Sequence, residues 1–283
     1  MNNWSETYRG AVPPWECDIT EHFTIAYYLD RLTDAARNLA DLLDLGDLLR
    51  GAGFHRLLHL RFMRELRAGS SFHIEGSALS LADGLRLGHR FVDSADGTVV
   101  TWVHEHWDLS GVPLSQLRRD AIAARLAAWE GPPIEERPDP VSRAGFLATA
   151  RGRVKPTDLD ADGRLNLAAI VHRFTDATMQ SGVAIGMDSE FLLAHRRGLS
   201  TFELTLLSTG ALALDESYLV ETGIAHFGAS SLRLVHVMTD LHSGREVARM
   251  SQYAVNLDLD ARRPARWPDE IRARALPLVV PVG

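Results

Sequence analysis

The feature that most constrains the fold is a stretch that occurs twice in the chain. Residues 12–35 align without gaps to residues 154–177, at an offset of 142 positions from Val12 to Val154. Unrelated stretches of ordinary composition would agree at roughly one or two of these positions. Eight aligned pairs are identical: Val12/Val154, Pro14/Pro156, Asp18/Asp160, Ala26/Ala168, Arg31/Arg173, Thr33/Thr175, Asp34/Asp176 and Ala35/Ala177. The sequence therefore contains one unit written twice, and the copies differ where His22 aligns with Arg164 and Thr24 with Asn166.

Length and composition agree with two globular domains. The chain has 283 residues, of which 46% are hydrophobic and 24% charged, enough to build two cores. Its net charge of -7 argues against broad binding to nucleic acid or to an anionic membrane. Cys17 is the single cysteine, which excludes an intrachain disulfide and a cysteine-based metal site. The start of the chain lacks an apolar signal segment, and we expect a cytoplasmic protein.

Both copies show the same order of periodicities. In the first copy, apolar residues at steps of three and four from Ile25 predict an amphipathic helix, with Thr24 as its N-cap and Gly46 as its end. Alternating residues then predict four strands at 57–66, 71–81, 85–92 and 98–109, joined in part by Asp-Gly turns. The second copy repeats this order with a helix at 166–185 and strands at 201–207, 217–227, 231–240 and 245–257.

This order predicts an α+β fold in which a long helix lies across an antiparallel sheet in each copy. We expect an N-terminal domain at 1–130, a proline-rich linker at 131–144 and a C-terminal domain at 145–283. Because the two units share one ancestry, they are expected to pack as a pseudo-symmetric pair.

Candidate chemistry lies just before the first long helix. Asp18 and His22 precede the end of the helix where unpaired N–H groups and the positive end of the dipole are found. There, Asp18 could act as a general base on water or as a nucleophile, and His22 could orient the substrate or move a proton. By position alone, a turn-forming aspartate and a hydrogen-bonded histidine are the commoner explanations of two such residues.

The repeated stretch also resembles the hotdog-fold acyl-CoA thioesterases, in the branch similar to 4-hydroxybenzoyl-CoA thioesterase. That family often has an Asp, then Gly, His and Asn, and a Tyr on the emerging helix. The pattern falls on these residues of the two copies: Asp18, Glu21, His22, Thr24 and Tyr28; Asp160, Gly163, Arg164, Asn166 and Ile170. The closing segment W-P-D-E-I-R-A-R at 267–274 is similar to the end of such proteins.

The resemblance implies two fused hotdog domains that form a pseudo-dimer, with active sites where paired domains meet. Copy one retains Asp, His and Tyr but lacks Gly and Asn, whereas copy two retains Asp, Gly and Asn but lacks His and Tyr. One complete site is therefore expected, on the motif of copy one, with Asp18 and His22 as catalytic residues. The substrate-binding residues expected around it are Trp15, Thr24, Tyr27, Tyr28, Glu65, Asp160, Arg164 and Asn166.

Several further candidates have simpler explanations. Glu65 could supply a second carboxylate but is also explained as a solvated strand end, and Trp15, Tyr27 and Tyr28 are equally explained as core. His104 and His106 share one face of a strand without an evident third metal ligand. The run at 195–197, His-Arg-Arg, could meet phosphates or could be a solvated loop. We expect Cys17 not to be a nucleophile, because neighbouring carboxylates disfavour its thiolate.

The expected activity is hydrolysis of a small acyl-CoA thioester to free acid and CoA. No metal or other cofactor is expected, coenzyme A being part of the substrate, and a homodimer of fused pairs is possible in principle. Two alternatives remain open. One is a hotdog enoyl-CoA hydratase or dehydratase, and the other is an acyl-CoA-binding protein without catalysis.

Overall fold

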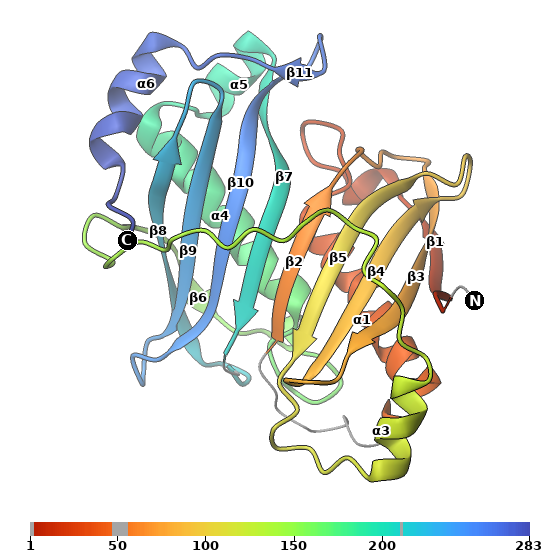
Figure 1. Cartoon of the computed structure of the whole chain (residues 1–283). Coiled ribbons are helices and arrows are strands. Elements are labelled where there is room, and N and C mark those ends of the chain that lie inside the picture. The colour runs from red at the N-terminus through yellow and green to blue at the C-terminus, as the bar shows by residue number, and fades with distance from the viewer. Residues whose placement is uncertain (1–2, 47–55, 210–211) are drawn as a thin grey trace. The chain divides into compact units, whose positions relative to one another are not determined.

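The computed structural model describes residues 3–46, 56–209 and 212–283, which form two compact units (Figure 1). The first unit comprises Met1–Ile134 with Leu207–Thr209, and the second comprises Glu135–Leu206 with Gly210–Gly283. The predicted end of the first helix at Gly46 is wrong: the helix ends at Leu42, and Asp44 turns the chain with a positive φ of 58°. The predicted elbow at 51–53 lies outside the described residues.

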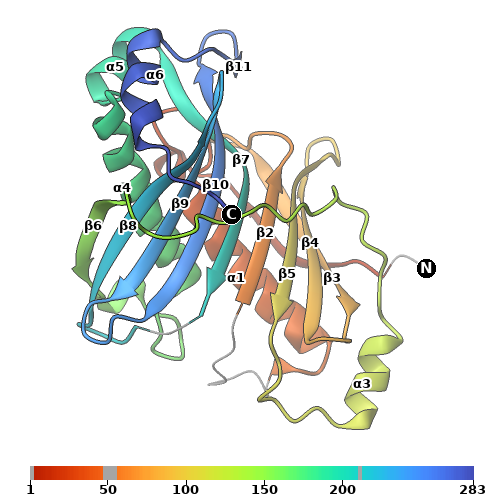
Figure 2. The ribbon, with the colours of Figure 1, turned by 60° about the vertical axis from the view of Figure 1, so that its left-hand side comes forward.

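The first unit is an antiparallel sheet with one long helix against it (Figure 2). In space the strands follow the order β1, β3, β4, β5, β2. The elements of this unit are β1 (Ser5–Ala11), the 3-10 turn η1 (Pro14–Glu16), α1 (Ile25–Leu42), β2 (Arg56–Phe62), β3 (Ser71–Ser80), β4 (Leu85–Asp93), β5 (Val99–Trp107) and α3 (Gln116–Ala123). The predicted helix and four of the strands are thus confirmed to within a few residues.

Helix α1 contacts the sheet through the apolar stripe that its sequence predicts. It packs mainly against β1 and β3. Its buried residues are Ala26, Tyr28, Leu29, Leu32, Ala35, Ala36, Leu39 and Ala40. Inward residues of the strands, among them Phe72 and Phe91, complete the core. Thr24 occupies the N-cap position as predicted, but its side chain makes no capping hydrogen bond.

The second unit repeats the arrangement with the strand order β7, β10, β9, β8, β6. Its elements are β6 (Leu147–Arg153), η2 (Pro156–Asp158), α4 (Leu167–Ile185), α5 (Ser189–His195), β7 (Arg197–Ser208), β8 (Ser217–Phe227), β9 (Ser231–Asp240), β10 (Glu246–Asp258), β11 (Arg263–Pro264), α6 (Asp269–Ala275) and η3 (Leu276–Leu278). Helix α4 lies on one side of its sheet in both views (Figures 1 and 2). A long helix wrapped by an antiparallel sheet, present twice, is the double hotdog fold that the sequence predicts.

The residues shared by the two copies are explained by packing. Arg31 on α1 pairs with Glu16 in η1 at 2.7 Å, and Arg173 on α4 pairs with Asp158 in η2 at 3.0 Å. Each pair ties the turn before the long helix to that helix. Thr33 and Thr175 both donate a hydroxyl hydrogen bond to the carbonyl four residues earlier. The repeat therefore preserves chiefly what holds the helix and its entry loop together.

The proline-rich segment lies on the outer faces of the strands. In the first unit, Trp129 just before the segment donates its ring N–H to the Pro132 carbonyl and packs edge-on against Trp102 of β5 at 5.3 Å. In the second unit, the Arg137 guanidinium lies over the Tyr253 ring at 4.5 Å, and Arg233 pairs with Asp139 at 3.0 Å. Figure 1 shows the segment crossing in front of β8, β9 and β10, whereas α4 lies behind them. The segment is therefore bound to the strands by side-chain contacts and is not a free spacer.

The core of the second unit contains a neutral polar network around His236. The ring Nδ1 lies 2.8 Å from the Thr222 hydroxyl, and Nε2 lies 3.2 Å from the Gln252 side-chain oxygen. Thr178 of α4 donates to the same oxygen at 2.8 Å. Burial lowers the pKa of His236 to about 4, so the ring is neutral in the folded protein near pH 7.

We expect this histidine to make the second unit less stable in mild acid. The unfolded chain takes up a proton below the ordinary pKa of 6.5, whereas the folded chain does so only near 4. The stabilisation is complete above 6.5 and is lost as pH falls towards 4, by up to about 3 kcal/mol. Urea denaturation of wild type and a His236→Gln variant between pH 7 and 4 checks this, and a variant with the wild-type pH dependence contradicts it.

Within the described residues, no helix combines the length and the apolar character needed to cross a membrane.

Candidate functional site

The entry loop of α1 forms a small hairpin that presents the predicted catalytic residues. It begins with Pro14 at the first position of η1, and Cys17 pairs with Phe23 through the backbone. At the tip, the Asp18 N–H donates to the His22 carbonyl and the Glu21 N–H donates to the Asp18 carbonyl, both at 2.9 Å. The hairpin is therefore a rigid platform that ends directly at the start of α1.

Asp18 holds this hairpin together. Its Oδ1 accepts hydrogen bonds from the Thr20 N–H at 2.8 Å, the Thr20 hydroxyl at 2.6 Å and the His22 N–H at 3.2 Å. Asp160 acts in the same way in the second copy, where its Oδ1 accepts from the N–H groups of Asp162 and Arg164. Because a copy without His22 keeps the two bonds from backbone N–H groups, turn formation alone accounts for the repeated aspartate.

His22 pairs with Glu65. The ring Nε2 lies 2.8 Å from the Glu65 carboxylate, and the two side chains are 11% and 34% exposed. Glu65 follows β2 in a loop that is held to the hairpin by the backbone, since the Phe23 N–H donates to the Leu66 carbonyl at 2.8 Å. The predicted residues His22 and Glu65 are thus brought together, and Glu65 lies in a loop after the strand, which ends at Phe62.

The second copy has neither member of this pair. Leu165 donates to Leu212 as Phe23 does to Leu66, so the two loops correspond at an offset of 146 positions from Leu66 to Leu212. By this correspondence Glu65 aligns with Ala211, a residue outside the described ranges. Arg164 replaces His22. Asn166 caps α4, because its side chain accepts from the Ala169 N–H at 2.7 Å. The histidine and the carboxylate are therefore lost together.

The predicted aromatic residues divide between the core and the surface. Tyr28 is buried against Phe23 and Phe62, and burial raises its pKa. Tyr27 is half-buried and stacks on Phe23. Trp15 is 79% exposed. Tyr28 is therefore a packing residue in this structure, whereas Trp15 is accessible to a ligand.

Burial raises the pKa of the Cys17 thiol, which agrees with the expectation that it is not a nucleophile. Its Sγ lies 3.9 Å from the Pro13 carbonyl, to which it donates.

The other polar candidates have structural partners. His106 Nε2 lies 2.7 Å from the Asp83 carbonyl, and the His104 ring packs edge-on against Trp129. The described residues include no group of three potential metal-binding side chains. The run at 195–197, for which phosphate contact and a solvated loop were both left open, lies at the end of α5 and the start of β7. His195 ends α5, and Arg196 and Arg197 pair with Asp260 and Asp258.

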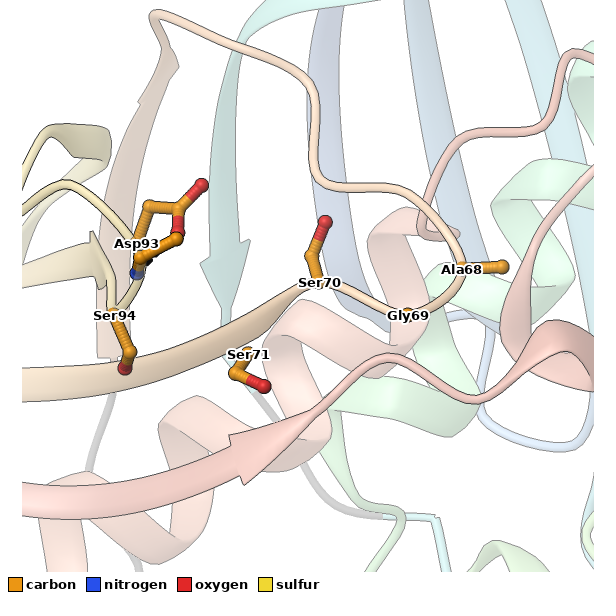
Figure 3. A pocket seen from close by; sticks show the side chains of 7 residues that line it. Ala68, Gly69, Ser70, Ser71, Asp93 and Ser94 are labelled. Carbon is orange, nitrogen blue, oxygen red and sulfur yellow. Dashed lines mark hydrogen bonds between the residues drawn. The ribbon is translucent and has the colours of Figure 1, made fainter.

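The loop that follows Glu65 and the turn after β4 line a polar hollow of about 560 Å³ (Figure 3). Its lining residues are Ala68, Gly69, Ser70, Ser71, Asp93, Ser94 and Ala95. None of the predicted site residues lines it, and its only charged side chain, Asp93, is paired with Arg64 at 2.6 Å.

Thr20 is a site residue that the sequence reasoning missed. It is buried, and its hydroxyl donates to Asp18 in the hairpin that carries His22. The pattern Asp-x-Thr could have indicated it, since an aspartate that accepts from the N–H two residues on forms an Asx turn.

A known protein family matches the second half of the chain. Residues 154–275 match the family profile described as Thioesterase-like superfamily. No curated protein matches the sequence. An acyl-ACP thioesterase from Bacteroides thetaiotaomicron is similar in structure, with 13% identity, 89% of this chain and 98% of that chain covered, and a TM-score of 0.67. A 12:0-ACP thioesterase from Umbellularia californica shows 13% identity, 90% and 94% coverage and a TM-score of 0.63. At 13% identity, these comparisons show that both structures share their fold with this chain.

Proposed function

Because residues 154–275 match the thioesterase-like superfamily profile, we propose that the protein belongs to this superfamily and hydrolyses acyl thioesters at a single site in the first half. The site consists of Glu65 and His22 at the start of α1. Coenzyme A enters this proposal as part of the substrate.

The observation that carries the proposal is the 2.8 Å contact between His22 and Glu65. A carboxylate and an imidazole within hydrogen-bonding distance are the groups required for general acid–base or nucleophilic catalysis. The pair stands beside the start of α1, where the Thr24 side chain makes no capping hydrogen bond and the Tyr27 N–H donates to the Thr24 carbonyl at 3.0 Å. The positive end of the helix dipole at this point would stabilise the oxyanion that forms from a thioester carbonyl.

The difference in exposure between the two side chains supports a division of roles. Glu65 is the more accessible of the two, and we propose that it removes a proton from water as the water oxygen bonds to the thioester carbon. His22, the more buried of the two, donates through Nε2, which orients the carboxylate. The tetrahedral intermediate then expels the thiolate, which takes the proton held by Glu65. The products are the free acid and the free thiol.

In this proposal Asp18 positions the hairpin and does not act as the base or nucleophile that the sequence suggested. An Asp18→Asn variant keeps an oxygen acceptor for Thr20 and His22, so we expect it to retain at least roughly a tenth of wild-type kcat. Asp18→Ala removes all three bonds and should lose about 10²-fold as His22 is displaced. Steady-state kinetics of the two variants decide the matter, because a catalytic Asp18 would make the asparagine variant as inactive as the alanine variant.

The carrier of the acyl group is proposed to be coenzyme A, as the resemblance of the entry loop implies. The two structural neighbours described above are named as acting on acyl-ACP, which makes acyl carrier protein the natural competitor. A panel of acyl-CoA and acyl-ACP substrates that share acyl chains compares the carriers directly.

Release of free thiol from that panel, followed with a thiol reagent, tests the activity. We expect thiol release by wild type and release at least about a hundredfold slower by Glu65→Gln. Loss of the enoyl absorbance with an intact thioester would indicate a hydratase instead. Saturable binding without either change would indicate a binding protein, and both outcomes would contradict the proposal.

A further inference from the structure

A second ion pair joins the two loops that bring His22 and Glu65 together. The Arg67 guanidinium lies 3.0 Å from the Glu21 carboxylate, with 46% and 76% of the two side chains exposed. Glu21 immediately precedes His22, and Arg67 follows Glu65 by two positions. His22 and Arg67 also pair through the backbone as an isolated antiparallel bridge. The ion pair therefore spans the same junction as the His22–Glu65 contact.

The backbone at Glu21 is one that glycine would adopt more readily. Its φ is 65°, and at the aligned position of the second copy Gly163 has a φ of 73°. A residue with a Cβ is strained in this left-handed region, where glycine is not. The same turn can thus be built without a side chain, and the fold alone gives no reason for a glutamate here.

The second copy shows which residues the turn needs and which it does not. Arg67 donates its N–H to the Ser70 hydroxyl, and Ala213 donates its N–H to the Glu216 carboxylate in the same way, so Arg67 corresponds to Ala213. The copy that lacks His22 and Glu65 therefore also lacks Glu21 and Arg67. By contrast, the ion pairs between turn and helix, Glu16–Arg31 and Asp158–Arg173, are present in both copies.

We propose that Glu21 and Arg67 are positioning residues, a clamp that holds the His22 hairpin against the Glu65 loop. The inference rests on the proposed function, because it assigns the clamp to the His22–Glu65 pair. An exposed ion pair adds little to global stability. It can still fix the separation of two catalytic side chains carried on different loops, where a misplacement of about 1 Å costs much of the rate.

The test compares Glu21→Gly, Arg67→Ala, the double variant and the charge reversal Glu21→Arg/Arg67→Glu. We expect each single variant to lower kcat about tenfold with KM unchanged. The double variant should be no worse than either single variant, and the charge reversal should recover at least half of wild-type kcat. Glu21→Gly should melt no lower than wild type, because glycine relieves the strained backbone.

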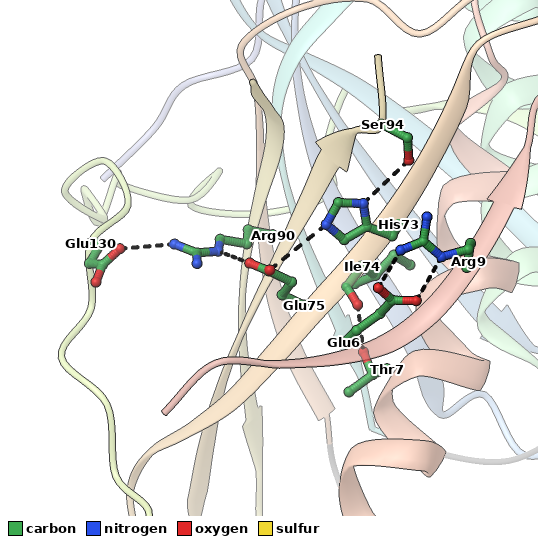
Figure 4. A network of polar contacts seen from close by, with 9 residues as sticks. All are labelled: Glu6, Thr7, Arg9, His73, Ile74, Glu75, Arg90, Ser94 and Glu130. Carbon is green, nitrogen blue, oxygen red and sulfur yellow. Dashed lines mark hydrogen bonds and ion pairs between the residues drawn. The ribbon is translucent and has the colours of Figure 1, made fainter. Parts of the chain in front are cut away.

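A matched control breaks an exposed ion pair elsewhere in the same unit. Glu6 and Arg9 on β1 are joined by a hydrogen bond of 2.8 Å between the Arg9 Nε and the Glu6 carboxylate (Figure 4). Figure 4 places this pair beside a separate network of His73, Glu75, Arg90 and Glu130. Glu6→Gln should leave kcat and KM at wild-type values.

The imidazole signals of His22 in ¹⁵N-labelled protein give a readout that does not depend on turnover. They are assigned with a His22→Gln sample and should move in Glu21→Gly and Arg67→Ala but not in Glu6→Gln. If wild type releases no thiol, the proposed function fails, and these signals alone then test whether Glu21 and Arg67 position His22. Wild-type kcat with unmoved signals in Glu21→Gly overturns the inference. A raised KM with unchanged kcat also overturns it, because Arg67 would then be a substrate contact.

Discussion

Glu65→Gln and His22→Asn are each expected to lower kcat/KM for the best thioester by about 10²- to 10⁴-fold. That loss equals about 3–5 kcal/mol of transition-state stabilisation. The glutamine has no basic oxygen with which to take a proton from water. The asparagine cannot place a ring N–H at 2.8 Å from the Glu65 carboxylate. Both substitutions preserve approximate side-chain size, so the hairpin should remain folded.

Non-additivity distinguishes a working pair from two independent contributions. If His22 acts through Glu65, the double variant should be no slower than the slower single variant. Circular dichroism and the melting temperature establish that all three variants are folded. A Glu65→Gln enzyme with wild-type turnover, or losses that multiply in the double variant, would contradict the proposed roles.

Glu105→Gln should cause the largest loss of stability in the first unit, about 3–5 kcal/mol. Glu105 on β5 is fully buried, and Arg56 of β2 donates to its carboxylate through Nε at 2.6 Å. Burial by itself would raise the pKa of Glu105, but the charge of Arg56 and the nearby His89 outweigh it and lower the pKa to about 2. Neutralising the carboxylate leaves the arginine charge without its buried partner.

The free energy of unfolding from urea denaturation measures this loss. Replacing both partners, as Glu105→Gln with Arg56→Met, should recover most of the stability, because no uncompensated charge remains. Asp83→Asn is the matched control. It breaks the exposed pair with Arg86, in which Nη2 lies 2.6 Å from the Asp83 carboxylate, and should change the free energy of unfolding far less than Glu105→Gln does. A Glu105→Gln variant no less stable than this control would contradict the expectation.

Acid should weaken the same pair. The carboxylate is ionised in the folded protein down to a pKa of about 2, whereas an ordinary glutamate takes up its proton near 4.5. The stability contributed by the Glu105 charge is therefore complete above 4.5 and is lost as pH falls towards 2. As pH falls, the contribution of neutral His236 is therefore lost first, from 6.5 towards 4, and that of the Glu105 charge follows.

Several features of the fold could be read from local patterns in the sequence. Period-2 and period-3.6 patterns placed the strands and the two long helices close to their observed bounds, for example 71–81 against Ser71–Ser80 for β3. Helix α5 at Ser189–His195 was not predicted, although Asp188 accepts from the Phe191 N–H and is a visible N-cap signal. A short helix presents too few turns for its periodicity to stand out.

The candidate site was only partly predictable. The motif identified the entry loop and His22, but it ranked Asp18 above Glu65. Position before a helix cannot show how many hydrogen bonds an aspartate accepts. In the structure, Asp18 Oδ1 is occupied by Thr20 and by the His22 N–H, whereas Glu65 meets the imidazole itself. The offset also changes from 142 in the entry loop to 146 after it, which hid the correspondence of Glu65 with Ala211.

The sequence by itself determined that this protein contains one α+β unit in two copies, because repetition and periodicity are properties of the chain alone. Only the tertiary structure decided which carboxylate faces His22, that Glu21 pairs with Arg67, and that Arg56 neutralises Glu105 inside the first sheet. Each of these contacts joins residues far apart in the chain. Their distances depend on strand register and loop path, which are set by the packing of the whole unit and leave no periodic signal in the sequence.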